Sequence, residues 1–139
     1  MIDFDNRSSL ECNLDLIESI AKSLTKREIE LILTSSQEMQ EINKQTRNID
    51  KSTDVLSFPY EEMPMFPLGS IVISAEHVQD KAKEFGHSNS DEFALLFIHG
   101  MLHLLGYDHE VDNGEMRAEE LKVIQKFNLP ESLIVRTQG

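Results

Sequence analysis

The chain has 139 residues, of which 40% are hydrophobic and 27% charged, and its formal net charge is −12. This composition is ordinary for a globular protein and excludes wholesale disorder, and no apolar run reaches the roughly 18 residues that a membrane span needs. A chain this acidic is not expected to bind nucleic acid through its overall charge. A polyanion partner would need a local basic patch or a metal. Residues 1–51 contain 7 basic and 10 acidic side chains, whereas residues 52–139 contain 6 and 15, so the first part is the better place for such a patch.

We expect one domain over residues 1–139, because the length is typical of a single domain and no repeat or linker divides the chain. The N-terminus has no apolar stretch of the kind found in secretory signals. The single cysteine, Cys12, cannot form an internal disulfide, and we interpret it as a small core or surface residue. Both features favour a cytoplasmic protein.

In the first half of the chain the hydrophobic pattern predicts two strands and two helices in alternation. In chain order these are a strand over residues 2–5, a helix capped by Asn13 with Leu14, Ile17, Ile20, Ala21 and Leu24 on its apolar side, a strand over residues 28–34, and a short helix opened by the capping box of Ser35 and Glu38.

The second half continues with short strands and longer helices. The prediction is a strand over residues 53–58, a loop over 61–67, a strand over 69–74, a helix from Ser74 to about Gly86, a helix over 91–105 capped by Ser90 and closed by Gly106, and a helix from about 113 to 127. Few, short strands among several helices predict an α+β (α/β-like) fold in which about four strands form a small sheet flanked by helices.

The predicted helix over residues 91–105 is apolar nearly all round and is therefore expected to be buried. It contains His99 and His103, whose i, i+4 spacing places both rings on one face. A left-handed turn at Gly106 would bring His109 to the same place. A lone histidine in such a helix is more often a core residue than a ligand. Here three of the chain's five histidines fall within eleven residues, so we expect His99, His103 and His109 to bind one metal ion.

Three neutral imidazoles suit Zn²⁺ best, with copper, nickel and iron as competitors. Three protein ligands leave one tetrahedral position for water, which is the pattern of catalytic rather than structural zinc. The spacing equals that of the metzincin proteases, but Gly100 stands where those enzymes have the general-base glutamate. The departure argues against a protease and leaves a phosphodiester as a suitable substrate. The other two histidines, His77 and His87, are interpreted as surface residues.

The run HGMLHLLGYDH, residues 99–109, resembles the signature of the bacterial YbeY family of metal-dependent endoribonucleases. Further stretches match in order and distance over residues 30–127: Asn43-x3-Arg47, TDVLSFP over residues 53–59, the strand over 69–74, and the helix EMRAEEL over 115–121. One departure is visible, because relatives usually have Asp where this chain has Ser70.

The resemblance implies a small mixed sheet flanked by helices and an enzyme that cleaves single-stranded RNA. It further implies roles in maturation of the 3′ end of 16S rRNA, ribosome biogenesis and ribosome quality control. The partners would be ribosomal RNA and components of the small subunit, with no membrane and no DNA. By the same resemblance the metal ligands are His99, His103 and His109, and Arg47 is the arginine of the cleft, where its guanidinium would hold the phosphate.

Several alternatives stay open at this level. Thr53 and Asp54 either line the cleft or cap the following strand, Asp108 either supports a ligand histidine or forms a turn, and the acidic run over residues 110–120 is interpreted as a solvated helix face. The nucleophile is either water at the metal or the 2′-hydroxyl of the RNA. Two other functions remain: a metal hydrolase acting on peptides or small molecules, and a non-catalytic ribosome-assembly factor with a structural metal.

Overall fold

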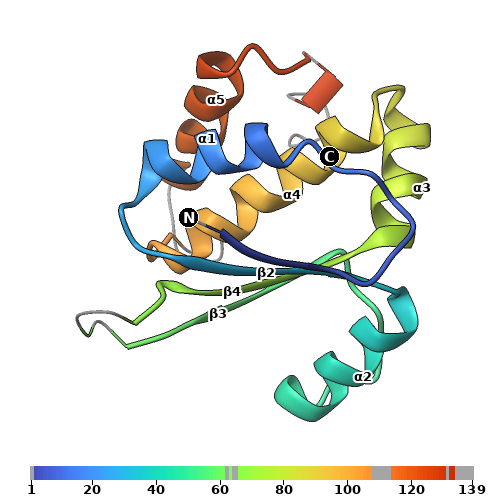
Figure 1. Ribbon diagram of the computed structural model, residues 1–139. Coiled ribbons are helices and arrows are strands. Elements are labelled where there is room, and N and C mark those ends of the chain that lie inside the picture. Colours follow the sequence, from blue (N-terminus) through green and yellow to red (C-terminus); the bar gives the residue numbers. More distant parts are fainter. Residues whose placement is uncertain (1, 62, 64–65, 108–113, 131, 134–139) are drawn as a thin grey trace.

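The computed structural model describes the chain except residues 1, 62, 64–65, 108–113, 131 and 134–139 (Figure 1). Its elements are β1 (Ile2–Asn6), α1 (Leu14–Leu24), β2 (Ile29–Thr34), α2 (Ser36–Arg47), β3 (Val55–Pro59), β4 (Gly69–Ser74), α3 (Ala75–Phe85), α4 (Asn89–Leu104) and α5 (Glu115–Lys126). The four strands form one mixed sheet in the order β1-β2-β4-β3. Strands β1, β2 and β4 are parallel, and β3 runs antiparallel to β4 at the edge. The predicted α+β class is confirmed.

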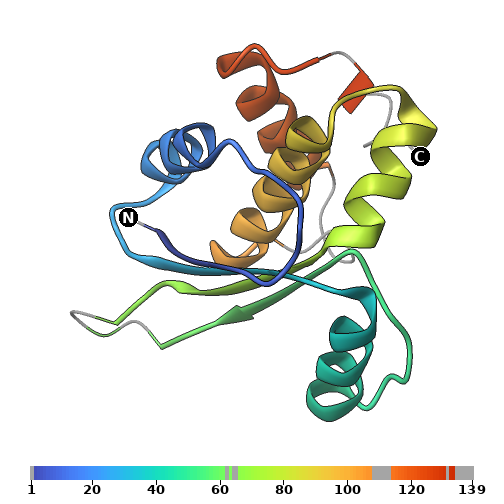
Figure 2. The same cartoon turned by 45° about the vertical axis from the view of Figure 1, so that its right-hand side comes forward.

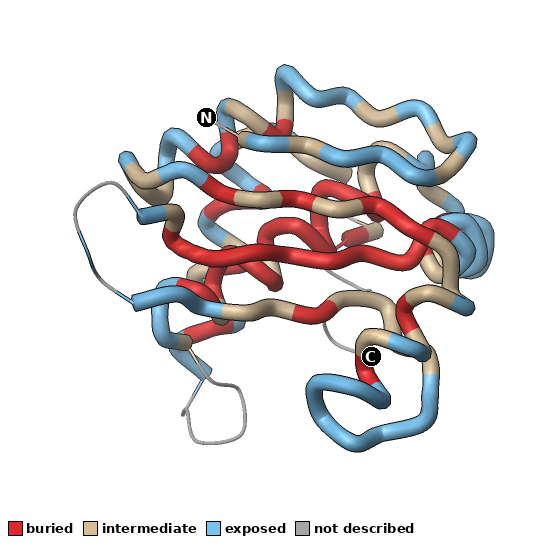
Figure 3. The backbone as a smooth tube through the Cα atoms, turned by 60° about the horizontal axis from the view of Figure 1, so that its bottom comes forward, coloured by how far each residue is buried: buried red, intermediate tan, exposed pale blue. Residues whose placement is uncertain are grey.

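The helices are unequally divided between the two faces of the sheet. Helix α4 lies on one face and contacts α1, α3 and α5, whereas α2 lies alone on the other face (Figures 1 and 2). Strand β4 is buried along its whole length, because it lies inside the sheet and is covered on both faces (Figure 3). This double burial explains why the run GSIVIS is apolar without alternation.

Side chains alternate between the two faces, as the two-residue period of a strand requires. Leu31 and Ile71 point to the α4 face and join the main core, which also contains Phe97 of α4. On the α2 face, Leu56 and Val72 pack against Met39 in a second, smaller core. Strand β4 therefore contributes to both cores, and the smaller core holds the edge strand β3 in place.

Most predicted helix ends are confirmed. The side chains of Asn13, Ser35 and Ser74 accept hydrogen bonds from backbone N–H groups in the first turns of α1, α2 and α3. The predicted cap at Ser90 is wrong, because α4 begins at Asn89 and Ser88 accepts the bond from the Asp91 N–H. The sequence held this signal, since Ser88 has an acidic residue three positions later.

Two further details differ from the prediction. Helix α2, expected to be short, runs over twelve residues to Arg47, and Leu14 at the start of α1 is 37% exposed although the pattern puts it on the apolar side. Within the described parts of the chain, no helix is long and apolar enough to cross a membrane.

Candidate metal centre and substrate cleft

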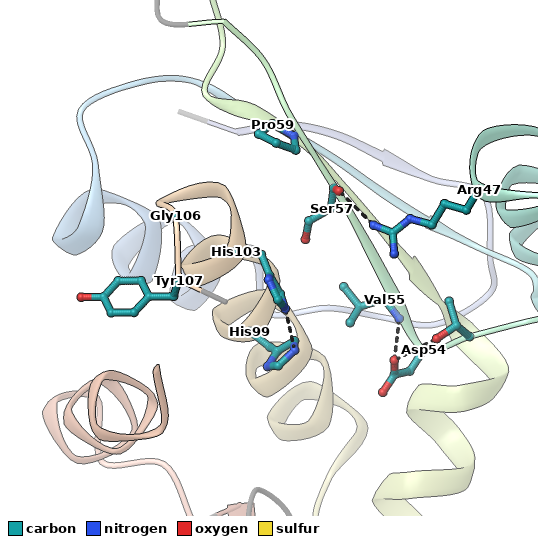
Figure 4. Close-up of a pocket in the computed structure, with 10 residues that line it drawn as sticks. Arg47, Asp54, Val55, Ser57, Pro59, His99, His103, Gly106 and Tyr107 are labelled. Atoms are coloured by element: carbon teal, nitrogen blue, oxygen red, sulfur yellow. Dashed lines mark hydrogen bonds between the residues drawn. The ribbon is translucent and has the colours of Figure 1, made fainter. Parts of the chain in front are cut away.

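The two helical histidines point their ring nitrogens at one place. On α4, Nε2 of His99 lies 3.2 Å from Nε2 of His103 (Figure 4), and the two rings meet edge to face. Two nitrogens that bind one tetrahedral zinc ion at about 2.0–2.1 Å lie roughly 3.3–3.4 Å apart. The spacing of these two nitrogens is therefore compatible with both binding one zinc ion.

The third predicted ligand, His109, lies outside the described residues, as does Asp108. In the part of the chain that the structure describes, no three His, Cys, Asp or Glu side chains converge on one point. Gly106 has a φ of 102°, and the N–H of Tyr107 donates to the Leu102 carbonyl, so the chain leaves α4 by the predicted left-handed turn.

A carboxylate that sequence reasoning missed holds one histidine in place. Nδ1 of His99 donates to Oε1 of Glu120 on α5 across 2.7 Å, and the Glu120 side chain is only 8% exposed. The interpretation of residues 110–120 as a solvated face is therefore wrong at Glu120. The signal was present, because Glu120 lies four residues after Met116 and three before Val123, both buried on the same side of α5.

This bond determines which nitrogen can bind metal. A carboxylate accepts a hydrogen bond only from a protonated Nδ1. In the neutral ring of His99 the lone pair is therefore on Nε2, the atom that faces His103. A carboxylate on the far nitrogen also fixes the orientation of the ring, as it does for metal-ligating histidines in other proteins. Glu120 thus holds the His99 ring with Nε2 directed toward His103.

The histidines open into a cavity of about 540 Å³ between the C-terminal part of α4 and the outer edge of β3. Its lining consists of Arg47, Thr53, Asp54, Val55, Ser57, Pro59, His99, His103, Gly106 and Tyr107. Three predicted site residues, Arg47, His99 and His103, therefore share one cavity although they come from opposite faces of the sheet.

Arg47 reaches this cavity around the edge of the sheet. Its guanidinium carbon lies 5.9 Å from the ring centre of Phe58, and Nη2 donates to the Ser57 carbonyl at 3.5 Å. Among the ion pairs that the structure describes, none includes Arg47. The Phe58 ring and the strand edge thus support the guanidinium. Figure 4 shows it directed toward Ser57, on the cavity side of β3.

The sequence left open whether Asp54 lines the cleft or caps the following strand, and the structure shows that it does both. Its Oδ1 accepts the Val55 N–H at 2.8 Å and the Thr53 hydroxyl at 3.4 Å, which caps β3. Asp54 and Thr53 also line the cavity. The cap therefore places a carboxylate within the cleft.

Comparison with known proteins identifies the family. The sequence profile of the family described as Endoribonuclease YbeY matches residues 3–128. The chain belongs to the YbeY family. An endoribonuclease YbeY of Sulfurimonas denitrificans is 69% identical over 139 residues, which cover 100% of both chains, and one of Nautilia profundicola is 60% identical over 99% of each chain.

The fold agrees with this assignment. The solution structure of a Thermotoga maritima protein matches with a TM-score of 0.63 at 30% identity, covering 91% of this chain and 89% of the other. The YbeY motifs recognised in the sequence, TDVLSFP and the histidine run, occupy the two walls of the cavity as far as the structure describes them.

Gly100 is the position at which this YbeY chain departs from the metzincin pattern, and packing explains the glycine. A Cβ at Gly100 would lie 2.9 Å from Cγ2 of Ile71 and 3.2 Å from Oγ of Ser57. The Ser57 hydroxyl donates to the Gly100 carbonyl at 3.2 Å. Helix α4 thus packs so closely on β3 and β4 that a side chain at position 100 would displace Ile71, and glycine avoids this overlap.

Ser70, the other departure, does not face the histidines. It pairs with Phe58 across β3 and β4, and directly opposite residues point to the same face, here the face covered by α2. Ser70 is buried and absent from the cavity lining. A carboxylate at position 70 would therefore lie on the other side of the sheet from the His99–His103 pair.

The remaining candidates lie away from the cleft. Cys12 packs half-buried against the main core, and burial raises the pKa of its thiol, so it is not poised as a thiolate ligand. His77 bonds the Ser74 hydroxyl and is half-buried. The interpretation of His87 as a surface residue is wrong: its side chain is 1% exposed and bonds Glu92 at 2.7 Å. Burial of a polar ring is tolerated there because a buried carboxylate accepts its N–H.

Replacing Gly100 by Ala should destabilise the fold. Alanine normally stabilises a helix interior by about 1 kcal/mol over glycine, but here the added methyl overpacks the contact with Ile71, which typically costs about 1–3 kcal/mol. Urea unfolding of the two proteins measures the balance. An unchanged or raised free energy of unfolding for Gly100→Ala would contradict the packing explanation.

Replacing Glu120 by Gln should weaken zinc binding by about 10- to 100-fold, the usual effect of losing such a carboxylate. Competition with a chromophoric chelator measures the dissociation constant. The matched control is Glu119→Gln, because Glu119 is the preceding residue on α5 and pairs only with the exposed Lys122 among the described ion pairs. Equal zinc affinity in the two variants would show that Glu120 does not support the metal.

Proposed function

We propose that this chain is a zinc-dependent endoribonuclease specific for single-stranded RNA, which matures the 3′ end of 16S rRNA and takes part in ribosome biogenesis and ribosome quality control in the cytoplasm. Membership of the YbeY family supports an endoribonuclease role. The observation that carries the proposal is the cavity in which the His99–His103 nitrogen pair lies opposite Arg47.

The metal would be held by His99, His103 and His109. When bound, zinc supplies Lewis acidity: it lowers the pKa of a water molecule towards neutrality and neutralises charge on a phosphate oxygen. The residues around it have separate tasks. Glu120 orients His99, and Arg47 offers two parallel N–H donors to the phosphate, whose negative charge grows as the fifth oxygen approaches phosphorus.

The charge distribution limits how the RNA is held. The chain carries a net charge of −12. Lys44 and Arg47 lie in the last turn of α2 and Lys51 follows in the next segment, and none of the three has a carboxylate partner among the described ion pairs. A few cations contact few phosphates, so RNA binding should be weak and should decrease with rising salt. Components of the small ribosomal subunit would add the contacts that this acidic chain lacks.

The nucleophile is identified by the product ends. Attack by the 2′-hydroxyl transfers its proton to a base, expels the 5′-oxygen, and leaves a 2′,3′-cyclic phosphate and a 5′-hydroxyl. Attack by water instead expels the 3′-oxygen and leaves a 3′-hydroxyl and a 5′-phosphate. Asp54 lies in the cavity as a proton acceptor for either route.

Metal content and cleavage should be lost together. Purified wild type should contain about one zinc ion per chain and cleave single-stranded RNA, and the substitutions His99→Ala, His103→Ala and His109→Ala should each remove both properties. His77→Ala is the matched control, because His77 lies outside the cavity and bonds Ser74. If His103→Ala kept its function in cells and lost only thermal stability, the chain would be an assembly factor with a structural metal. Cleavage of unstructured peptides but not of RNA would make it a peptide hydrolase.

Arg47→Ala should lower kcat by about 10²- to 10³-fold, the range for losing one donor to a transition-state oxyanion. Its melting temperature should change little, because Arg47 is exposed and makes one long hydrogen bond. Single-turnover kinetics at equal zinc content test this. Unchanged turnover would refute the role, and Lys44→Ala, one turn earlier on α2, controls for general loss of charge.

A further inference from the structure

The backbone N–H and C=O groups of β3 point alternately toward β4 and toward the open edge of the sheet. The Ser74 N–H donates to the Asp54 carbonyl at 2.9 Å, and the Tyr60 N–H donates to the Leu68 carbonyl at 3.0 Å. In an antiparallel pair such bonded residues recur at every second position. The residues between them, Val55, Ser57 and Pro59, therefore direct their own N–H and C=O groups away from β4, toward the open edge.

Of the donors on this edge, one is without a partner in the described structure. The Val55 N–H is accepted by Asp54, and Pro59 has no N–H. The Ser57 carbonyl accepts from Arg47, but the Ser57 N–H has no acceptor among the described residues. Among the outward-directed N–H groups of this strand edge, only that of Ser57 is therefore left to bind a ligand, as far as the structure describes it.

This donor belongs to the cavity. Ser57 lines it, and the Ser57 hydroxyl donates to the carbonyl of Gly100, the residue after His99. Ser57 therefore lies against the turn of α4 that carries both histidines (Figure 4). The guanidinium of Arg47 contacts the carbonyl of the same residue, so a backbone N–H and a cationic fork lie side by side on one edge.

We propose that the main-chain N–H of Ser57 is a second phosphate donor, which binds one non-bridging oxygen of the scissile phosphate while Arg47 binds the other. The inference rests on the proposed cleavage of RNA. Backbone N–H groups are common phosphate ligands, and a donor fixed by a sheet needs no reorganisation as charge develops on the oxygen. Because a backbone donor to the phosphate contacts no base, this interaction is independent of the RNA sequence.

The sheet permits a substitution that removes only this donor. Proline is tolerated in an edge strand where the N–H points outward, as Pro59 already shows two residues later. Ser57→Pro removes the N–H and the hydroxyl, whereas Ser57→Ala removes the hydroxyl alone. At equal zinc content, kcat of Ser57→Pro should be about 10²- to 10³-fold below that of Ser57→Ala. A ratio near one, with wild type active, overturns the inference and leaves the proposed function intact.

Two further measurements keep the test decisive. If Ser57→Pro does not fold, replacement of Ser57 by its α-hydroxy acid through nonsense suppression converts the amide to an ester and removes the N–H without adding a ring. Because this replacement keeps the side-chain hydroxyl, the same drop is expected relative to wild type. Independently of cleavage, the Ser57 amide proton should shift downfield in NMR spectra when a 2′-O-methyl single-stranded oligonucleotide is added. An unmoved amide overturns the inference, whereas a shifted amide in a wild type that does not cleave RNA overturns only the proposed function.

Discussion

The close contact of α4 with β3 and β4 at Gly100 is the constraint on which the site depends. Because glycine has no side chain to displace Ile71 there, the part of α4 that carries His99 and His103 lies directly against the edge strand. The Gly100 carbonyl, bonded by Ser57, joins the two walls. The same contact disfavours a glutamate at the position where a metzincin protease has one, because its Cβ would overlap Ile71.

Around this contact, the polar side chains that line the cavity come from separate elements, and a neighbouring residue fixes the position of each. Glu120 of α5 orients His99, Phe58 and Ser57 support Arg47, and the Asp54 cap fixes the start of β3. Such support is what a reaction at a phosphate requires, because small displacements of the donors weaken transition-state stabilisation. In an acidic chain, this arrangement places the Arg47 guanidinium in the same cavity as the two histidines.

Features that depend on neighbouring residues could be predicted from the sequence. The helix caps at Asn13, Ser35 and Ser74 and the left-handed turn at Gly106 are confirmed, because each depends on residues within a few positions. Sequence reasoning was wrong at Ser90, His87 and Glu120. At Ser90 a neighbouring cap competed, and the two buried groups depend on partners that only a folded chain supplies.

By itself, the sequence determined the alternation of strands and helices, the pairing of His99 with His103 on one buried helix, and the family, since periodicity and motif spacing are properties of the chain. Only the tertiary structure decided that Arg47 and the histidines line one cavity, and that a backbone donor at Ser57 points to the open edge of β3 beside them. The physical reason is that strand order and register bring together residues 40 to 60 positions apart, and no local pattern encodes which edges and faces will meet.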